Sequence, residues 1–62
     1  MQGNDLRALR KSAKLTQGAL ADAIGMSRKT VNEMELDKAP IEKRTELAVR
    51  YVVEHPERFD GT

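Results

Sequence analysis

Residues 16–35 read TQGALADAIGMSRKTVNEME, and this is the most informative stretch of the chain. Thr16 suits the start of a helix, because its hydroxyl accepts a hydrogen bond from a free backbone N–H of the first turn. Leu20 and Ile24 recur at helical spacing, and Gly25 adopts at little cost the left-handed conformation that ends many helices. The first half of the stretch is therefore predicted to be a short helix that stops at a sharp turn.

A second helix is predicted directly after the turn. Ser27 is its expected N-cap, and Val31 and Met34 lie three residues apart on its buried side. Met26 is expected to fill the space between the two helices as an apolar plug. Ala21 falls where the helices cross closely, so a larger side chain there would push them apart.

One further helix is predicted on each side of this pair. Leu6, Leu9 and Ala13 form the buried stripe of the first helix. Pro40 is favoured at the first position of a helix, and Pro56 disfavours helix in the residue before it. The expected fold class is all-α, a single domain over residues 1–62, with helices from about Asn4 or Asp5 to Ala13, over 17–24, from 28 to about Leu36, and over about 40–55.

Length and composition limit the alternatives. A chain of 62 residues buries too little apolar surface to be very stable unless metals, disulfides or association help. It has no cysteine, which excludes disulfides and thiolate metal sites, and no apolar run approaches the roughly 20 residues of a membrane helix. We therefore expect a cytoplasmic protein without membrane contact, cofactor, metal or evident small-molecule ligand, in which association of copies adds stability.

The basic side chains are concentrated in the half of the chain that holds the helix pair. The net charge is only +1, but residues 1–34 carry six basic and three acidic side chains, whereas residues 35–62 carry five basic and seven acidic ones. A surface that faces phosphate groups requires such a local surplus. A solvated surface of mixed charge explains the total equally well, so charge alone does not decide the function.

The helix pair also has a recognisable order of residue types. The order is polar Gln17, apolar Leu20, small Ala21, apolar Ile24, Gly25, apolar Met26, polar Ser27, Arg28 and Lys29, apolar Val31, polar Asn32 and Glu33, and apolar Met34. It resembles the helix-turn-helix of the phage Cro and repressor family, also called the XRE-type regulators, and the likeness extends from residues 6–10 to Glu35 and Pro40. The resemblance implies a compact four-helix, lambda-repressor-like domain with the helix-turn-helix over about residues 16–36.

The resemblance also implies a function. We expect a sequence-specific regulator that binds double-stranded DNA as a homodimer on an inverted-repeat operator, in the role of a repressor of a phage, mobile-element or small bacterial operon. The alternative is a protein-binding module or antitoxin that keeps the fold and binds a partner through the last helix. An enzyme is not expected, because the only histidine, His55, stands beside Pro56 as an expected surface residue without a catalytic pattern around it.

The candidate base contacts lie on the polar face of the second helix of the pair and match positions at which the family touches DNA. They are Ser27, Arg28, Lys29, Asn32 and Glu33. Arg28 is expected to bind a guanine, and Lys29 a guanine or a phosphate. Asn32 is expected to bind an adenine or a phosphate, and Glu33 the amino group of a cytosine. A surface ion pair is the alternative for Lys29 and Glu33, which are four residues apart.

The candidate phosphate contacts are Gln17, Gly18 and Lys38. Gln17 opens a helix, where free backbone N–H groups and an amide side chain can hold a phosphate. Gly18 either allows close approach of the DNA backbone or is simply tolerated in the first turn. Lys38 resembles a backbone contact of the family, although a lone exposed lysine is more often only solvated.

The resemblance further implies an ion pair between Arg10 and Glu35 that fastens the second helix of the pair to the first helix of the chain. Such a pair matters only if it is partly buried, because exposed pairs contribute about 0–1 kcal/mol. Two positions depart from the family pattern, since Ala19 replaces the capping-box glutamate and Asp37 replaces the usual glycine. Aspartate adopts the left-handed conformation at modest cost, so we expect the turn at Asp37 to survive.

The last predicted helix is more apolar than one buried face requires. Its central face is flanked on both sides, and the whole arc spans about 240°, against roughly 100° or more for an ordinary surface helix. The central residues are Ile41, Thr45, Ala48 and Val52, with Leu47 and Tyr51 on one side and Val49 and Val53 on the other. We expect a dimer interface that includes Leu47, Tyr51 and Val53, and generous burial within a small protein is the alternative.

Overall fold

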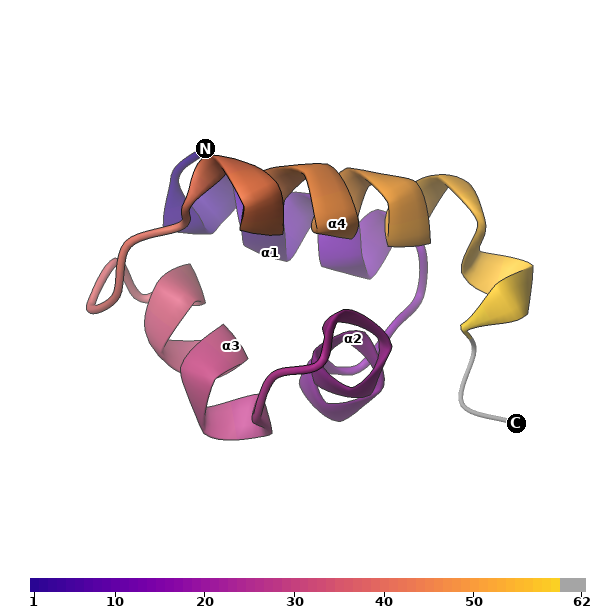
Figure 1. Ribbon diagram of the computed structural model, residues 1–62, viewed down its shortest axis with the longest axis horizontal. Helices are drawn as coiled ribbons and strands as arrows, with labels where there is room; N and C mark the ends of the chain where they lie inside the picture. The colour runs from indigo at the N-terminus through magenta and orange to yellow at the C-terminus, as the bar shows by residue number, and fades with distance from the viewer. Residues whose placement is uncertain (60–62) are drawn as a thin grey trace.

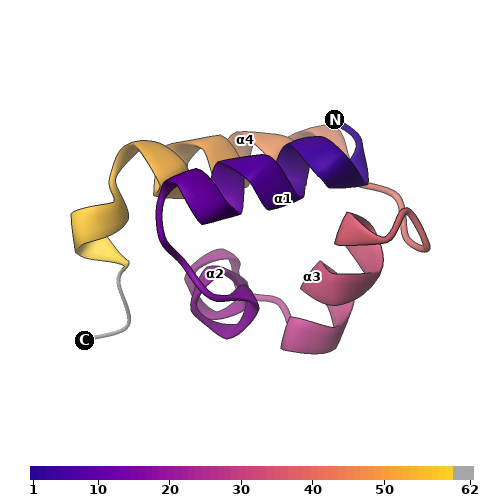
Figure 2. The ribbon, with the colours of Figure 1, turned by 180° about the vertical axis from the view of Figure 1, so that it is seen from behind.

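The computed structural model describes residues 1–59, which form four α-helices in two layers and no strand. α1 and α4 lie side by side and run in the same direction, while α2 and α3 lie together on one side of them (Figures 1 and 2). The all-α expectation is confirmed. The elements are α1 (Gly3–Ser12), α2 (Gln17–Ile24), α3 (Arg28–Glu35), α4 (Lys43–Glu54) and a short 3₁₀ helix, η1 (Pro56–Arg58).

The core lies between the two layers and draws on every α-helix. Its largest fully buried side chains are Leu6, Leu20, Val31, Met34 and Val49. Burying a side chain of this size contributes about 1.5–3 kcal/mol relative to leaving it exposed. The small Ala21 is also buried, as expected where α2 and α3 cross, and Met26 packs against the core from the turn.

Side-chain hydroxyls cap α2 and α3 as the sequence predicts. The Thr16 Oγ1 atom accepts the backbone N–H of Ala19 at 3.0 Å, and the Ser27 Oγ atom accepts that of Thr30 at 3.1 Å. Each bond satisfies one of the first-turn N–H groups that have no partner within the helix. Both helix starts are therefore set by local chemistry.

The first three helices end in the same kind of turn. Within two positions of the end of each helix, one residue has a positive φ: 61° at Lys14, 73° at Gly25 and 60° at Asp37. At Asp37 the backbone N–H donates to the Met34 carbonyl, and the N–H of Lys38 donates to the Glu33 carbonyl. This pair of bonds is the Schellman motif, which satisfies the last free carbonyls of a helix. The turn expected at Asp37 is confirmed.

Lys14 holds a left-handed backbone conformation without being a glycine. This conformation costs a residue with a Cβ atom about 1–2 kcal/mol. Glycine avoids that cost, but it loses more conformational freedom on folding. Lys14→Gly is therefore expected to raise the free energy of unfolding by about 0.5–1 kcal/mol. Thermal unfolding followed by circular dichroism measures the gain. Lys11→Gly is the control, since Lys11 lies inside α1 and its replacement is expected to lower stability by about 1 kcal/mol. A loss of stability in both variants would contradict the reading of the turn.

One expectation for α4 is wrong. The helix begins at Lys43 rather than near Pro40, because Ile41 packs against the core before the helix starts and Glu42 is still extended, with φ −70° and ψ 158°. Val53, which is expected at a dimer interface, is half-buried and packs in part against the core. The buried side of α4 is formed by Thr45, Val49 and Val52, so the helix is rotated toward the Val49 side of the expected arc.

Within residues 1–59, no helix has the length and apolar character needed to cross a membrane.

Candidate nucleic-acid interface

The polar face of α3 lies at the surface, opposite the buried Val31 and Met34. Arg28, Lys29 and Asn32 are exposed, and Glu33 is half-buried. Four of the five predicted base contacts therefore share one helix. The fifth, Ser27, is exposed at the N-cap, where its hydroxyl also lies 2.9 Å from that of Thr30.

The first turn of α2 lies beside the first turn of α3. A Cβ atom added to Gly18 would lie 3.9 Å from the Arg28 Cδ atom, which is an ordinary contact distance. The fold would therefore accept a methyl group at this position, and no contact within the protein requires glycine there. Because the N–H groups of a first turn have no partner within the helix, the backbone at Gln17 and Gly18 offers donors next to the Arg28 side chain.

Gln17 is also engaged through its side chain. Its Nε2 atom donates to the Asn32 Oδ1 atom and to the Glu35 Oε1 atom, both at 3.1 Å. The amide that was expected to hold a phosphate thus bridges two residues of α3. This bridge is a feature that reasoning from the sequence missed, because it depends on how α2 and α3 cross.

The structure brings Arg10 and Glu35 together in a largely buried ion pair. The Arg10 Nε atom lies 2.6 Å from Glu35 Oε2, and its Nη2 atom lies 3.1 Å from Oε1. The side chains are only 11% and 4% exposed, respectively. The Arg10 Nη1 atom also donates to the Leu15 carbonyl at 2.9 Å. One guanidinium therefore ties α1 to α3 and to the segment that precedes α2.

The surroundings of Glu35 favour its charged form. Burial by itself raises the pKa of this carboxyl, but hydrogen bonds from Arg10 and Gln17 and the positive charges of Arg10 and Arg7 outweigh it and lower the pKa below its ordinary value. Glu35 is therefore ionised at neutral pH. An ionised carboxylate only accepts hydrogen bonds, which fixes the direction of every bond made to it.

The backbone of α1 also comes very close to the backbone at the end of α3, at Gly3. A Cβ atom on Gly3 would lie 2.4 Å from the Glu35 carbonyl oxygen, so only glycine allows this approach. The Gly3 N–H donates to the Asp37 Oδ1 atom at 2.9 Å. Asp37 thus closes the turn after α3 and satisfies a free donor of α1, which gives aspartate a role at this position that glycine could not fill. No local pattern in the sequence signals this contact.

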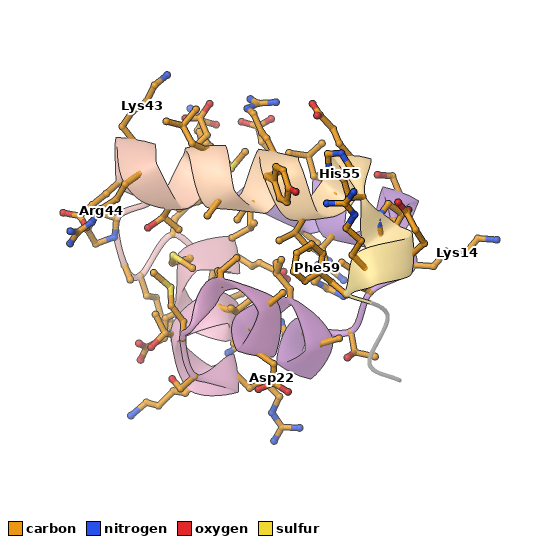
Figure 3. All side chains as sticks on the ribbon, turned by 45° about the vertical axis from the view of Figure 1, so that its right-hand side comes forward. Lys14, Asp22, Lys43, Arg44, His55 and Phe59 are labelled. Atoms are coloured by element: carbon orange, nitrogen blue, oxygen red, sulfur yellow. The ribbon has the colours of Figure 1, made fainter. Side chains whose placement is uncertain are left out.

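The remaining predicted contacts lie apart from the α2–α3 junction. Lys38 is exposed in the turn after α3. On α4, Leu47 and Tyr51 are 57% and 47% exposed. His55 and Phe59 lie near the end of α4 (Figure 3), where the Tyr51 ring stacks at 4.4 Å from the His55 ring. Among the described residues there is no cluster of three or more groups that could hold a metal ion.

Comparison with known proteins identifies the family. A helix-turn-helix family model matches residues 6–45, a span that includes both helices of the junction and the Arg10–Glu35 pair. The chain belongs to this family, the XRE-type helix-turn-helix regulators, and is a DNA-binding regulator of transcription. The family is one of DNA-binding proteins rather than of enzymes. No curated protein and no solved structure matches the chain significantly.

Proposed function

We propose that the protein is a homodimeric repressor that occupies an inverted-repeat operator of a small operon. The observation that carries the proposal is the exposed polar face of α3, held against α1 by the buried Arg10–Glu35 pair and flanked by the free N-terminus of α2. A helix presented in this way fits the major groove, where its first residues meet the base edges. The unengaged donors at the start of α2 would then meet a phosphate.

The side chains of α3 divide into different roles in this arrangement. Arg28 suits a bidentate contact with guanine, and Glu33 suits the amino group of cytosine. Lys29 is placed to bind either a guanine or a phosphate. Ser27 has less freedom, because its hydroxyl already caps the helix. Lys38 adds positive charge beyond the C-terminus of α3, where a phosphate contact requires no particular base.

The exposed side of α4 is suited to pack against the same side of a second copy of the chain. Leu47 and Tyr51 lie in the middle of this side, Arg44 lies near its start and Glu54 at its end. A two-fold axis between Leu47 and Tyr51 makes the two α4 helices antiparallel, so that each Arg44 faces Glu54 of the second copy. The face is thus complementary to itself in charge, as a symmetric interface requires.

The operator geometry follows from this symmetry. One recognition helix reads only a few base pairs, which is too few to define one site in a genome. Two copies joined through α4 would read an inverted repeat with half-site centres about 10 base pairs, or roughly 34 Å, apart. Selection of bound duplexes from a random pool, followed by titration at several salt concentrations, tests the proposal. A single half-site, or enrichment without any sequence preference, would contradict it.

Arg28→Ala is expected to weaken binding to the selected site by about 1–3 kcal/mol and to relax the base preference at one position of each half-site. Lys43→Ala is the matched control, because it removes the same charge from α4, where the side chain points away from α2 and α3 (Figure 3). Fluorescence anisotropy on selected and scrambled duplexes measures both effects. Equal losses on the two duplexes in the Arg28 variant would remove this residue from the base-reading set.

A further inference from the structure

The hydrogen bonds of Gln17 connect the buried ion pair to the surface that faces DNA. Arg10 donates to both oxygens of the Glu35 carboxylate, and the Gln17 amide nitrogen donates to one of them, Oε1. The second bond of this nitrogen goes to the Asn32 Oδ1 atom, at the exposed surface of α3. Four side chains therefore form a chain of contacts from the protein interior to Asn32, a predicted base contact.

The direction of each bond along this chain is determined by chemistry. Glu35 is ionised and only accepts, so Gln17 must turn its Nε2 atom, and not its Oε1 atom, toward it. The same Nε2 atom then meets Asn32, which must present an acceptor, its Oδ1 atom. This bond occupies one lone pair of the Asn32 oxygen and holds that oxygen toward Gln17, so the amide nitrogen, which is a donor only, is the group of that side chain with no partner in the protein.

This polarity changes the base that Asn32 is suited to read. A bidentate contact between asparagine and adenine needs the amide oxygen and the amide nitrogen at the same time. In this structure the oxygen is already bound to Gln17. Guanine instead presents two acceptors in the major groove, O6 and N7, and both suit the two N–H groups of an amide nitrogen.

We propose that Gln17 and Glu35 are positioning residues that make Asn32 a hydrogen-bond donor, so that it selects guanine over adenine. The inference rests on the proposed function and names the specificity of one position in the site. It replaces the expectation of an adenine contact at Asn32, which considered the asparagine side chain without its neighbour on α2.

Selection from a random duplex pool with three variants tests the proposal. Asn32→Ala identifies the base position that depends on this side chain, and guanine is expected there in the wild type. Gln17→Ala frees the Asn32 amide to rotate, which is expected to shift the preference at that position toward adenine by about tenfold. Gln17→Lys is expected to retain guanine, because an ammonium group is also a donor only. Lys43→Ala is the control, since Lys43 is exposed at the start of α4, outside the proposed DNA contacts, and its replacement should leave the preference unchanged.

The orientation of the two amides is measured independently in the free protein by NMR. The Gln17 side-chain N–H groups are expected to be protected from exchange with water, and those of Asn32 to exchange freely. Adenine at the Asn32 position of the wild type, an unchanged preference in Gln17→Ala, or the reverse protection pattern would overturn the inference and leave the proposed function standing. A pool without any enriched site would contradict the proposed function, and the inference would fall with it.

Discussion

Arg10→Met is expected to lower the free energy of unfolding by about 3–5 kcal/mol, because it leaves the Glu35 carboxylate buried without its main partner. The Glu35 side chain is only 4% exposed and accepts two bonds from Arg10, at 2.6 and 3.1 Å. A domain of this size rarely has more than about 3–5 kcal/mol of stability in total, so the variant is expected to be largely unfolded at room temperature. Urea and thermal denaturation followed by circular dichroism measure the loss.

Two further variants separate this ion pair from a general effect of removing arginine. Arg10→Met combined with Glu35→Leu is expected to recover most of the stability, since apolar pairs often replace buried ion pairs at little cost. Arg50→Met is the control, because Arg50 is 50% exposed and its pair with Glu46 is of the kind that contributes about 0.3–0.5 kcal/mol. An Arg10 variant that loses no more than the Arg50 variant would show that the buried pair does not hold α3 in place.

Leu47→Glu is expected to give a folded monomer whose affinity for the operator is about 100-fold lower or more. Leu47 is 57% exposed, so the core does not depend on it, but a carboxylate there would be buried against the Tyr51 ring of the second copy in the proposed interface. Without the second copy only one half-site is read, and the advantage of specific over non-specific binding, typically about 10³-fold or more, is mostly lost. Sedimentation equilibrium gives the oligomeric state, and anisotropy titrations give the affinity.

The control for the interface is Leu36→Glu, which adds the same charge to a leucine that is 54% exposed but lies outside α4. It is expected to leave the dimer intact. Arg44→Glu is expected to weaken the dimer, and adding Glu54→Arg is expected to restore it, if the two α4 helices are antiparallel. A wild-type monomer at micromolar concentration that binds one half-site tightly would contradict the dimer, although it would not affect the helix-turn-helix.

Features that depend only on residues close together in the sequence could be predicted from it. The caps at Thr16 and Ser27 and the turn at Gly25 follow from the hydrogen-bonding groups and the backbone freedom of the residues themselves. The start of α4 could not be predicted in this way, because the favourable position of Pro40 is outweighed by the packing of Ile41 against the core. At the start of α4, tertiary packing therefore outweighs the local helix preference.

The same distinction between local and tertiary contacts applies to the candidate site. The exposed residues of α3 could be proposed from the pattern, because a helix with one apolar side must expose the other. The bridge from Gln17 to Asn32 and Glu35 joins residues 15 and 18 positions apart, and only the crossing of α2 and α3 brings them together. The close approach of Gly3 to the Glu35 carbonyl is also non-local. The exposure of these side chains was therefore predictable, but the hydrogen bonds that orient them were not.

An NMR titration of the labelled protein with its selected operator duplex tests directly whether the N-terminal part of α3 reads the DNA. The largest amide shifts are expected in the first turn of α2, at residues 17–19, and along residues 27–33, at Ser27 and in α3. The exposed face of α4 is expected to respond little, because it is already covered in the dimer. Large shifts confined to α4, with α2 and α3 unchanged, would contradict the claim that the N-terminal part of α3 reads the DNA.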